Sequence, residues 1–302
     1  NTEHAASLFG LKEFGNIYSR LGNPTVGALE ARLTDLEEGA MCVALSSGTS
    51  AVMYSLINIM SQGDNFVTAN QLYGGTYTMF DNILPEYGID SKKVDITDLK
   101  AVEDAIDDKT RAIYCETITN PGLVVADVTA LSEIAHAKGI PLIVDATFTT
   151  SAIQKSFEFG ADIVVYSLTK WMSGHGRVIA GAVIEKGGFD WGNGNFPLYD
   201  KPDTSYGGMR WGHDLGDLSS VAYSLRLRTV PLRNLGANMS PETAFEVMSG
   251  LETLGLRMDR HCENAIKAAE YLSDHELVEW IRYPGLKDDP AYELSEKYLK
   301  GT

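Results

Sequence analysis

The sequence has 302 residues, of which 44% are hydrophobic and 22% charged, and its formal net charge at pH 7 is −16. The length suggests about two domains, and the composition is that of an ordinary globular protein. So large an acidic excess repels phosphate backbones and argues against a nucleic-acid partner. No apolar run reaches the roughly 18 residues of a membrane span, and the N-terminus lacks a signal pattern. We therefore expect a cytoplasmic protein with no membrane partner.

The chain contains three cysteines, Cys42, Cys115 and Cys262. Their number is odd, and their spacing is not that of a zinc site. Two of them fall inside apolar, strand-like runs, where cysteine behaves as a small buried hydrophobic side chain. We therefore expect reduced thiols without a catalytic role, and no metal site.

Short apolar runs alternate with helical patterns along the first two thirds of the chain. A helix begins at Asn23-Pro24-Thr25, where Thr25 can cap it, and ends at Gly39. Further helices are predicted over residues 46–60, 76–84 and 129–138, the second of them stopping at Pro85. Strands are predicted at residues 41–45, 66–69, 112–116, 141–145, 162–167 and 178–184.

Strands that are apolar throughout and separated by helices indicate a mostly parallel sheet that is buried on both faces. The predicted fold class is therefore α/β, doubly wound. Residues 187–216 are rich in glycine, asparagine, aspartate, proline and aromatic side chains, which predicts a long excursion rather than a core element. Helical periodicity returns over residues 240–275, and a strand-like segment follows at 278–283. This pattern indicates the beginning of a second domain.

Lys170 follows the predicted strand 162–167 directly. Open α/β sheets bind ligands at the carboxyl ends of their strands. A lysine at that edge is a candidate for a Schiff base, and the hydroxyls of Ser167 and Thr169 could donate to a phosphate. The pattern is weak by itself, because a lysine after a strand is most often a solvated end.

Asp145 is the last residue of the predicted strand 141–145. A carboxylate at the end of a buried strand is costly unless it is paired. A protonated pyridine nitrogen in the same cleft would be a suitable partner, because the ion pair keeps such a ring an electron sink. The alternative is that Asp145 only caps the following helix.

Residues 46–51 are small and join a strand to a helix, so that backbone N–H groups and the helix dipole favour an anion there. The stretch is neither a dinucleotide fingerprint nor a P-loop, and an ordinary capped helix start would look the same. Tyr73 lies in a glycine-flanked loop after strand 66–69, where it could lie flat on an aromatic cofactor. A lone tyrosine in such a loop more often serves packing.

The order of these four features is more informative than any one of them. The small-residue loop, the loop tyrosine, the strand-end aspartate and the lysine are all predicted at one edge of one sheet. They follow one another as in the pyridoxal 5'-phosphate (PLP) enzymes of fold type I.

The sequence resembles the Cys/Met-metabolism family of PLP enzymes over essentially its whole length. The stretches that carry the resemblance are 18–25 (YSRLGNPT), 47–48, 72–74 (LYG), 116–121 (ETITNP), 144–145, 167–170 (SLTK) and 173–176 (SGHG). Two further stretches resemble the O-acetylhomoserine sulfhydrylase branch: 188–191 (GFDW) with the polar excursion to residue 216, and 232–241 (LRNLGANMSP) leading into 250–254 (GLETL).

This resemblance implies a fold-type I PLP transferase with a mostly parallel sheet flanked by helices and the start of a smaller α/β C-terminal domain. It divides the chain into an N-terminal arm at 1–34 that contacts a neighbouring subunit, a PLP-binding domain at 35–232 and the beginning of a C-terminal domain at 233–302. Family members continue beyond this point, and the arginine that binds the substrate carboxylate lies there. Part of the N-terminal arm is also expected to be missing.

The resemblance also assigns roles to residues. Lys170 would carry PLP as a Schiff base and move protons at Cα and Cβ of the substrate. Asp145 would pair with the pyridinium, and Tyr73 would stack on the ring and help to protonate the leaving group. The other cofactor-binding residues would be Gly48, Thr49, Ser167 and Thr169 at the phosphate, Asn120 near the ring hydroxyl, and Tyr18 and Arg20 reaching the phosphate of the neighbouring subunit.

The implied reaction is γ-replacement, in which sulfide or a thiol displaces acetate from O-acetylhomoserine and gives homocysteine or methionine. A methionine or cystathionine γ-lyase and a cystathionine γ-synthase of the same family are alternatives, and a non-catalytic PLP-binding remnant is another. Against a methionine-cleaving lyase, Tyr73 is followed by Gly74-Gly75 without the cysteine of that branch. A homo-oligomer is also implied, as a dimer of dimers with active sites shared across each dimer.

Overall fold

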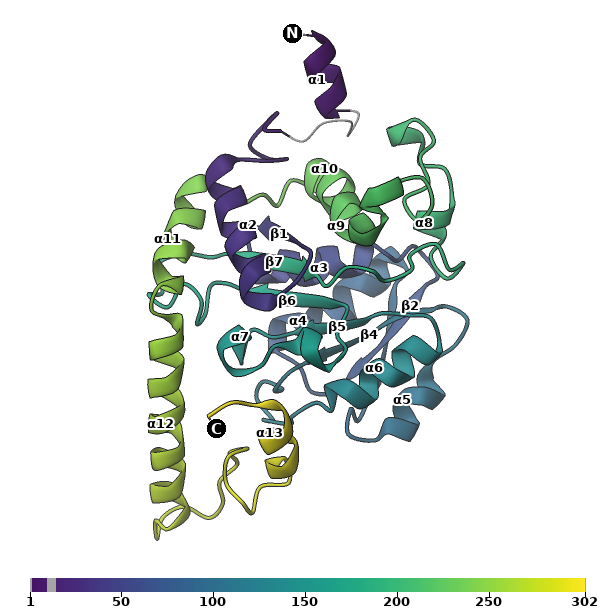
Figure 1. Cartoon of the computed structure of the whole chain (residues 1–302). Coiled ribbons are helices and arrows are strands. Elements are labelled where there is room, and N and C mark those ends of the chain that lie inside the picture. Colours follow the sequence, from purple (N-terminus) through teal and green to yellow (C-terminus); the bar gives the residue numbers. More distant parts are fainter. Residues whose placement is uncertain (1, 10–14, 302) are drawn as a thin grey trace.

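A seven-stranded sheet forms the centre of the protein in the computed structural model, which describes residues 2–9 and 15–301 (Figure 1). The strands lie in the order β1-β7-β6-β5-β4-β2-β3. β7 is antiparallel to both neighbours, and the other neighbouring pairs are parallel. The strands are β1 (Met41–Leu45), β2 (Asn65–Ala69), β3 (Asp90–Val94), β4 (Thr110–Glu116), β5 (Leu142–Asp145), β6 (Ile163–Ser167) and β7 (Gly181–Glu185). The predicted α/β class with a mostly parallel sheet is confirmed.

Helices cover both faces of this sheet. The helices of the described residues are α1 (Thr2–Phe9), which projects away from the sheet in Figure 1, α2 (Pro24–Glu37), α3 (Gly48–Ile57), α4 (Gly74–Thr78), α5 (Leu99–Ala105), α6 (Val128–Ala137), α7 (Thr150–Ile153), α8 (Pro197–Asp200), α9 (Ala222–Leu227), α10 (Arg233–Leu235), α11 (Pro241–Leu251), α12 (Leu254–Ser273) and α13 (Tyr292–Tyr298). α6 packs on β4 and β5 on the near face in Figure 1, and α3 packs on β6 and β7 behind the sheet. Within the described ranges, no helix is long and apolar enough to cross a membrane.

The strand predictions at 41–45, 66–69, 112–116, 141–145, 162–167 and 178–184 correspond to β1, β2, β4, β5, β6 and β7. β3 was not predicted, because its sequence DSKKV is polar. It lies at the edge of the sheet, where it is half-buried and Lys92 and Lys93 discourage pairing with another strand.

Three helix boundaries differ from the prediction. Asn23, not Thr25, caps α2, and its Oδ1 accepts from the N–H of Thr25 at 3.0 Å. The reason is Pro24, which lacks an N–H and favours the first helical position, so that the residue before it becomes the cap. α3 ends at Ile57 instead of residue 60. The segment predicted as a helix over 76–84 continues from α4 through a π turn (Met79–Ile83) into a 3₁₀ turn (Leu84–Tyr87) that includes Pro85.

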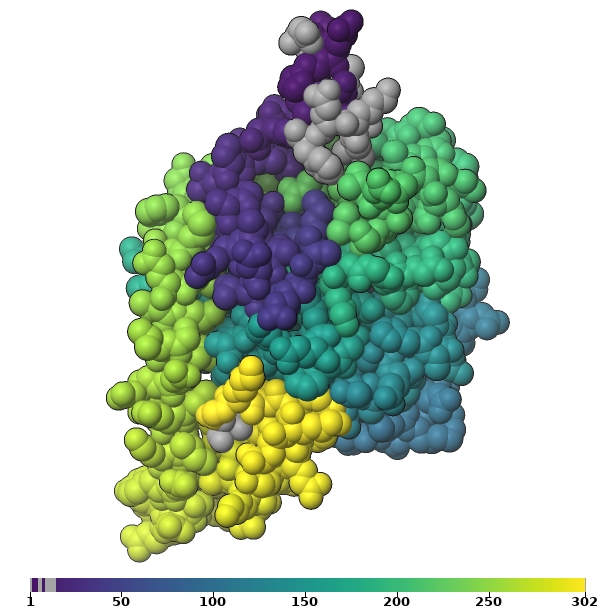
Figure 2. Space-filling model, in the orientation of Figure 1, coloured from purple at the N-terminus to yellow at the C-terminus, as the bar shows by residue number. Residues whose placement is uncertain are grey.

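The strand predicted at residues 278–283 is wrong. These residues form irregular backbone with one bend beyond the end of α12, far from the sheet in Figure 1. A strand needs a neighbouring strand that accepts its backbone hydrogen bonds, and none lies there among the described residues. Trp280, within this segment, is 74% exposed. In Figure 2, α12 lies along one flank and the chain after it turns back onto the body, where Tyr298 packs edge-on against Phe159.

The excursion at residues 187–216 is anchored in the core, contrary to the prediction. The ring of Trp191 is stacked between Tyr199 and Tyr223, with centroids 5.1 and 5.0 Å away. The indole N–H of Trp191 donates to Glu185 at 3.2 Å, and the N–H of Ser224 donates to the same carboxyl group at 2.8 Å. Burial raises the pKa of Glu185 to about 7.

A second buried carboxyl group, that of Glu37, joins α2 to the sheet. The hydroxyl of Tyr166 in β6 donates to it. Burial raises the pKa of Glu37 to about 7, although the hydrogen bonds from Tyr166 and Ser151 act in the opposite direction. Glu37 and Glu185 are therefore polar contacts inside the core that do not line the cavity described below.

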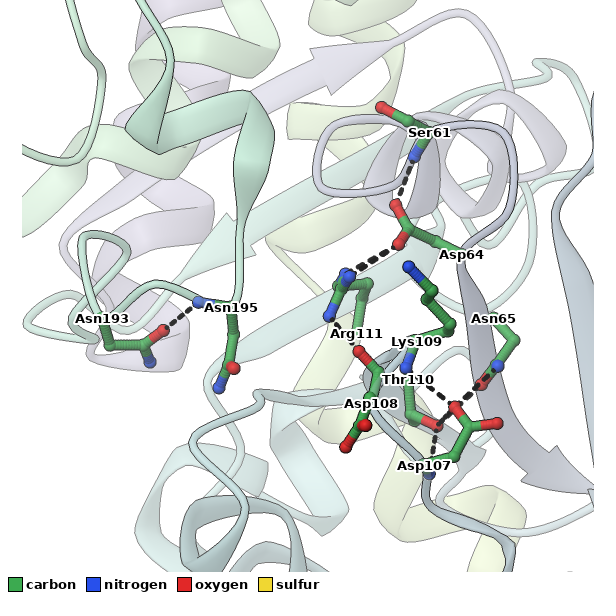
Figure 3. A network of polar contacts seen from close by, with 10 residues as sticks. All are labelled: Ser61, Asp64, Asn65, Asp107, Asp108, Lys109, Thr110, Arg111, Asn193 and Asn195. Carbon is green, nitrogen blue, oxygen red and sulfur yellow. Dashed lines mark hydrogen bonds and ion pairs between the residues drawn. The ribbon is translucent and has the colours of Figure 1, made fainter.

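At the amino ends of the strands, a polar network ties β2 to β4 (Figure 3). Asp64, just before β2, accepts from Nε of Arg111 at 2.9 Å and from the N–H of Ser61 at 2.8 Å. The side chains of Asp64 and Arg111 are each only 9% exposed. Asn193 and Asn195, which also appear in Figure 3, donate to the carbonyl of Gly139 and attach the excursion to the end of α6.

Replacing Asp64 with alanine should lower the free energy of unfolding by about 3–5 kcal/mol, because the Arg111 guanidinium would remain buried without its partner. Urea unfolding followed by circular dichroism measures this change. Asp104, whose pair with Lys100 is more than half exposed, is the matched control, and its replacement should cost at most about 0.5 kcal/mol. Equal losses in the two variants would show that burial of the Asp64–Arg111 pair does not matter.

Candidate active site

The carboxyl ends of β4, β5 and β6 meet along one edge of the sheet. Glu116 is the register partner of Asp145, and Ser167 is the partner of Gly181, where the antiparallel β7 begins. A cavity of about 510 Å³ opens at this edge, a size suited to a cofactor with a small substrate. Its lining includes eight of the residues predicted from the sequence: Gly48, Thr49, Tyr73, Asn120, Asp145, Ser167, Thr169 and Lys170.

Lys170 lies in the tight turn that follows β6. Its backbone N–H donates to the carbonyl of Ser167 at 3.3 Å, and its carbonyl accepts from Gly174 at 3.0 Å. The side chain is exposed to the cavity. Within residues 15–301, the Lys170 amine has no hydrogen bond or ion pair, which leaves it available to a ligand.

Side chains of α12 hold this turn in place. Arg257 donates from Nη1 to the carbonyl of Trp171 at 2.7 Å and from Nη2 to the carbonyl of Gly250 at 2.8 Å. The ring of Trp171 packs against that of His261, with centroids 4.8 Å apart. The residue that follows Lys170 is thus fixed through both its backbone and its side chain.

Asp145 lies at the back of the cavity. Its Oδ1 accepts from the N–H of Thr147 at 2.9 Å, and its Oδ2 accepts from the hydroxyl of Tyr114 at 3.1 Å. Burial raises its pKa despite these bonds, and in the described part of the chain no lysine or arginine pairs with it. Asp145 does not cap a helix, since α7 begins only at Thr150. A cation in the cavity would offset the cost of burying this carboxylate.

The N-terminus of α3 faces the same cavity. Ser47 caps the helix by accepting from the N–H of Ser50 at 3.0 Å, and the first N–H groups of a helix have no partner within it. A Cβ on Gly48 would lie 2.5 Å from Cβ of Ser167, so only glycine allows the helix to approach β6 this closely. The hydroxyl of Thr169 is already paired with the backbone of Ala180 at 3.0 and 3.2 Å. Gly48, Thr49 and Ser167 are therefore the residues most available to bind an anion.

Tyr73 precedes α4 and is 48% exposed at the cavity. A Cβ on Gly75 would lie 2.7 Å from Cε1 of Tyr73, so the glycine gives the ring its space. The N–H of Tyr73 donates to Oε1 of Glu116 at 2.7 Å. Oε2 of the same carboxylate accepts from the N–H of Asn120 at 2.9 Å, just before the cis peptide bond to Pro121.

Tyr18 and Arg20 do not line the cavity of their own chain. The Arg20 guanidinium lies 5.1 Å from the centroid of the Tyr18 ring, and Tyr18 is 60% exposed. The two residues form a surface pair close to the start of α2.

Two further side chains, Glu116 and Thr147, arrange this site and were not predicted from the sequence. Glu116 stood in one of the quoted stretches without a role, although it ends a buried strand as Asp145 does. The same cost of burying an unpaired carboxylate could have drawn attention to it. Thr147 links two strands, because its hydroxyl accepts from the N–H of Ser167 at 2.7 Å while its N–H donates to Asp145. No pattern in the sequence predicts the contact between Thr147 and Ser167.

An open sheet with a lysine, a buried carboxylate, a tyrosine and a helix N-terminus at its carboxyl edge is the arrangement of the fold-type I α/β enzymes that use PLP. Comparison with known proteins gives the same class in more detail. The chain belongs to the family of Cys/Met metabolism PLP-dependent enzymes, whose model matches residues 1–302. It is therefore an enzyme with PLP as its cofactor.

Similar proteins carry related names. O-acetyl-L-homoserine sulfhydrylase of Leptospira meyeri is 44% identical over 303 residues, which cover 99% of this chain and 69% of that protein. Homocysteine synthase of Schizosaccharomyces pombe is 44% identical over 301 residues, which cover 99% and 70%. A putative O-acetylhomoserine (thiol)-lyase structure from Campylobacter jejuni, which contains a pyridoxyl-lysine 5'-monophosphate, matches with a TM-score of 0.95 and 38% identity over 99% of this chain and 74% of that one.

The residues at the cavity fit this cofactor. The buried carboxylate of Asp145 suits a protonated ring nitrogen, and the first turn of α3 suits a phosphate. The free amine of Lys170 suits the aldehyde.

Gly48→Ala should weaken PLP binding, because its new methyl group would push α3 away from Ser167 and open the anion site. Overpacking of this kind typically costs about 1–3 kcal/mol, which corresponds to a roughly fivefold to 150-fold higher dissociation constant. Equilibrium dialysis of PLP against the apoprotein measures it. Gly27→Ala is the matched control, since a Cβ there meets nothing within 4 Å. Wild-type affinity in Gly48→Ala would mean that the close approach is not needed.

Proposed function

We propose that this protein replaces the acetate group of O-acetyl-L-homoserine with sulfur. Sulfide would give homocysteine, and a thiol such as methanethiol would give methionine. In the exchange the Cγ–O bond breaks, a Cγ–S bond forms and acetate leaves. The observation that carries the proposal is the single cavity in which Lys170, Asp145, Tyr73 and the N-terminus of α3 converge. The names of relatives that match 99% of the chain support the choice of substrate.

When bound, PLP supplies an electron sink for the negative charge that develops at Cα and Cβ of an amino-acid substrate. Asp145 would keep the ring nitrogen protonated, and its bonds from Thr147 and Tyr114 fix the carboxylate in place for this role. The backbone N–H groups of Gly48 and Thr49 would hold the phosphate.

Two side chains handle protons in the proposed reaction. Lys170 would hold the cofactor through its amine, and the same amine would take the proton from Cα of the substrate and move protons at Cβ. Its exposure to the cavity and the anchoring of the next residue by Arg257 support this role. Tyr73 would stack on the cofactor ring and donate a proton toward the departing group, and Asn120 would hold the ring hydroxyl.

With O-acetyl-L-homoserine and excess sulfide, the holoenzyme should form homocysteine and acetate faster than 2-oxobutyrate. The reason is that sulfur should add at Cγ faster than that carbon is protonated, and protonation there is the route to 2-oxobutyrate and ammonia. Mass spectrometry of the product mixture over time measures both outcomes. Lys170→Ala is the control and should give no turnover and no borohydride-fixed pyridoxyl-lysine. Dominant 2-oxobutyrate and ammonia would instead assign the protein to the lyases.

We also propose where the enzyme is located and how its subunits assemble. We place the enzyme in the cytoplasm, in methionine biosynthesis, since its three free cysteines suit a reducing compartment. We also propose a homo-oligomer, a dimer of dimers, in which Tyr18 and Arg20 of one chain reach the phosphate bound by the next. Their position outside their own cavity supports this arrangement.

Sharing of the site can be tested by mixing an Arg20→Ala chain with a Lys170→Ala chain. Each variant alone should be nearly inactive. In a mixed dimer, one of the two sites carries both intact residues, so about a quarter to a half of the wild-type rate should return, depending on how the chains pair. Heterodimers that form, as seen by native mass spectrometry, but stay inactive would place Arg20 in its own subunit's site.

A further inference from the structure

Glu116 ends β4 inside the cavity and is only 5% exposed. The roles proposed above do not use it. From its contacts we propose that Glu116 is a positioning residue, whose carboxylate holds the loops of Tyr73 and Asn120 together around the cofactor. The inference rests on the proposed roles of those two residues.

Each oxygen of the Glu116 carboxylate bonds to a different loop. Oε1 accepts from the N–H of Tyr73 at 2.7 Å, and Oε2 accepts from the N–H of Asn120 at 2.9 Å. These residues follow different strands, β2 and β4, and are far apart in the sequence. One side chain therefore sets the distance between the backbone that carries the ring-covering tyrosine and the backbone that carries the asparagine. Only an ionised carboxylate presents two full acceptors in this way.

The ionisation of Glu116 also depends on Asp145, the carboxylate proposed to pair with the cofactor ring. Burial raises the pKa of Glu116 to about 7, and the neighbouring Asp145 carboxylate adds to the rise. A cation beside Asp145 would offset this repulsion and favour the ionised form of Glu116. Binding of a cationic ring would thus strengthen the bonds that hold the two loops.

A second buried glutamate in the protein serves as a control for the loss of a buried carboxyl group. Glu37 is also buried with a pKa raised to about 7, but it contacts Tyr166 and Ser151 outside the cavity. A general effect of losing a buried carboxylate should therefore appear in a Glu37 variant, whereas an effect on the two loops should not.

The test compares Glu116→Ala, Glu116→Gln and Glu37→Gln by hydrogen exchange with mass spectrometry and by PLP dialysis. In Glu116→Ala, peptides that cover residues 70–78 and 117–124 should exchange roughly tenfold faster or more, because both N–H groups lose a charged acceptor. The PLP dissociation constant should rise roughly tenfold to hundredfold. Glu116→Gln keeps one acceptor oxygen, so one loop should loosen and the affinity should fall less. Glu37→Gln should leave both loops and the affinity within about twofold of wild type.

Wild-type exchange in both loops of the Glu116 variants would overturn the proposal, as would equal loosening of these loops in Glu37→Gln. If Glu116→Ala fails to fold, hydrogen exchange and PLP dialysis of the nearly isosteric Glu116→Gln test the proposal instead. No substrate is used, so a failed sulfur transfer would refute the proposed reaction without touching this inference.

Discussion

The close approach of three backbone segments at Gly48, Ser167 and Gly181 is the constraint on which the site depends. A Cβ on Gly48 would collide with Ser167, and a Cβ on Gly181 would lie 2.8 Å from the backbone nitrogen of Gly48 and closer still to the carbonyl of Ser47. Gly181 pairs with Leu45 on one side and Ser167 on the other. Because β7 is antiparallel, its first residue lies beside the last residues of β1 and β6. The anion-binding end of α3 is therefore next to the turn that carries Lys170.

The rest of the site is arranged around this point by polar contacts between neighbouring segments. Thr147 joins the backbone of Ser167 to the carboxylate of Asp145, and Glu116 joins the loops of Tyr73 and Asn120. α12 reaches across from the other side through Arg257. Each of the proposed catalytic side chains is thus held by a residue that would not react itself. That is the support which a precise site requires.

The sequence predicted the buried strands well because a strand covered on both faces must be apolar along its whole length. β3 escaped prediction since an edge strand is under no such requirement, and residues 278–283 were wrongly assigned because apolar character does not supply a pairing partner. The convergence of Lys170, Asp145 and Tyr73 followed from their places at strand ends. The antiparallel direction of β7 and the bonds of Glu116 depend on contacts between distant residues, and periodicity carries no signal for them.

The two buried glutamates outside the cavity, Glu37 and Glu185, have a consequence for the whole protein. Each has a folded-state pKa of about 7, whereas an unfolded glutamate titrates near 4.5. Their contribution to stability is complete below the unfolded value and is lost as the pH rises through the folded value. Folding in the window between these values takes up protons, so the heat of unfolding measured by calorimetry depends on the ionisation enthalpy of the buffer. The native protein also carries less negative charge near neutrality than its formal −16.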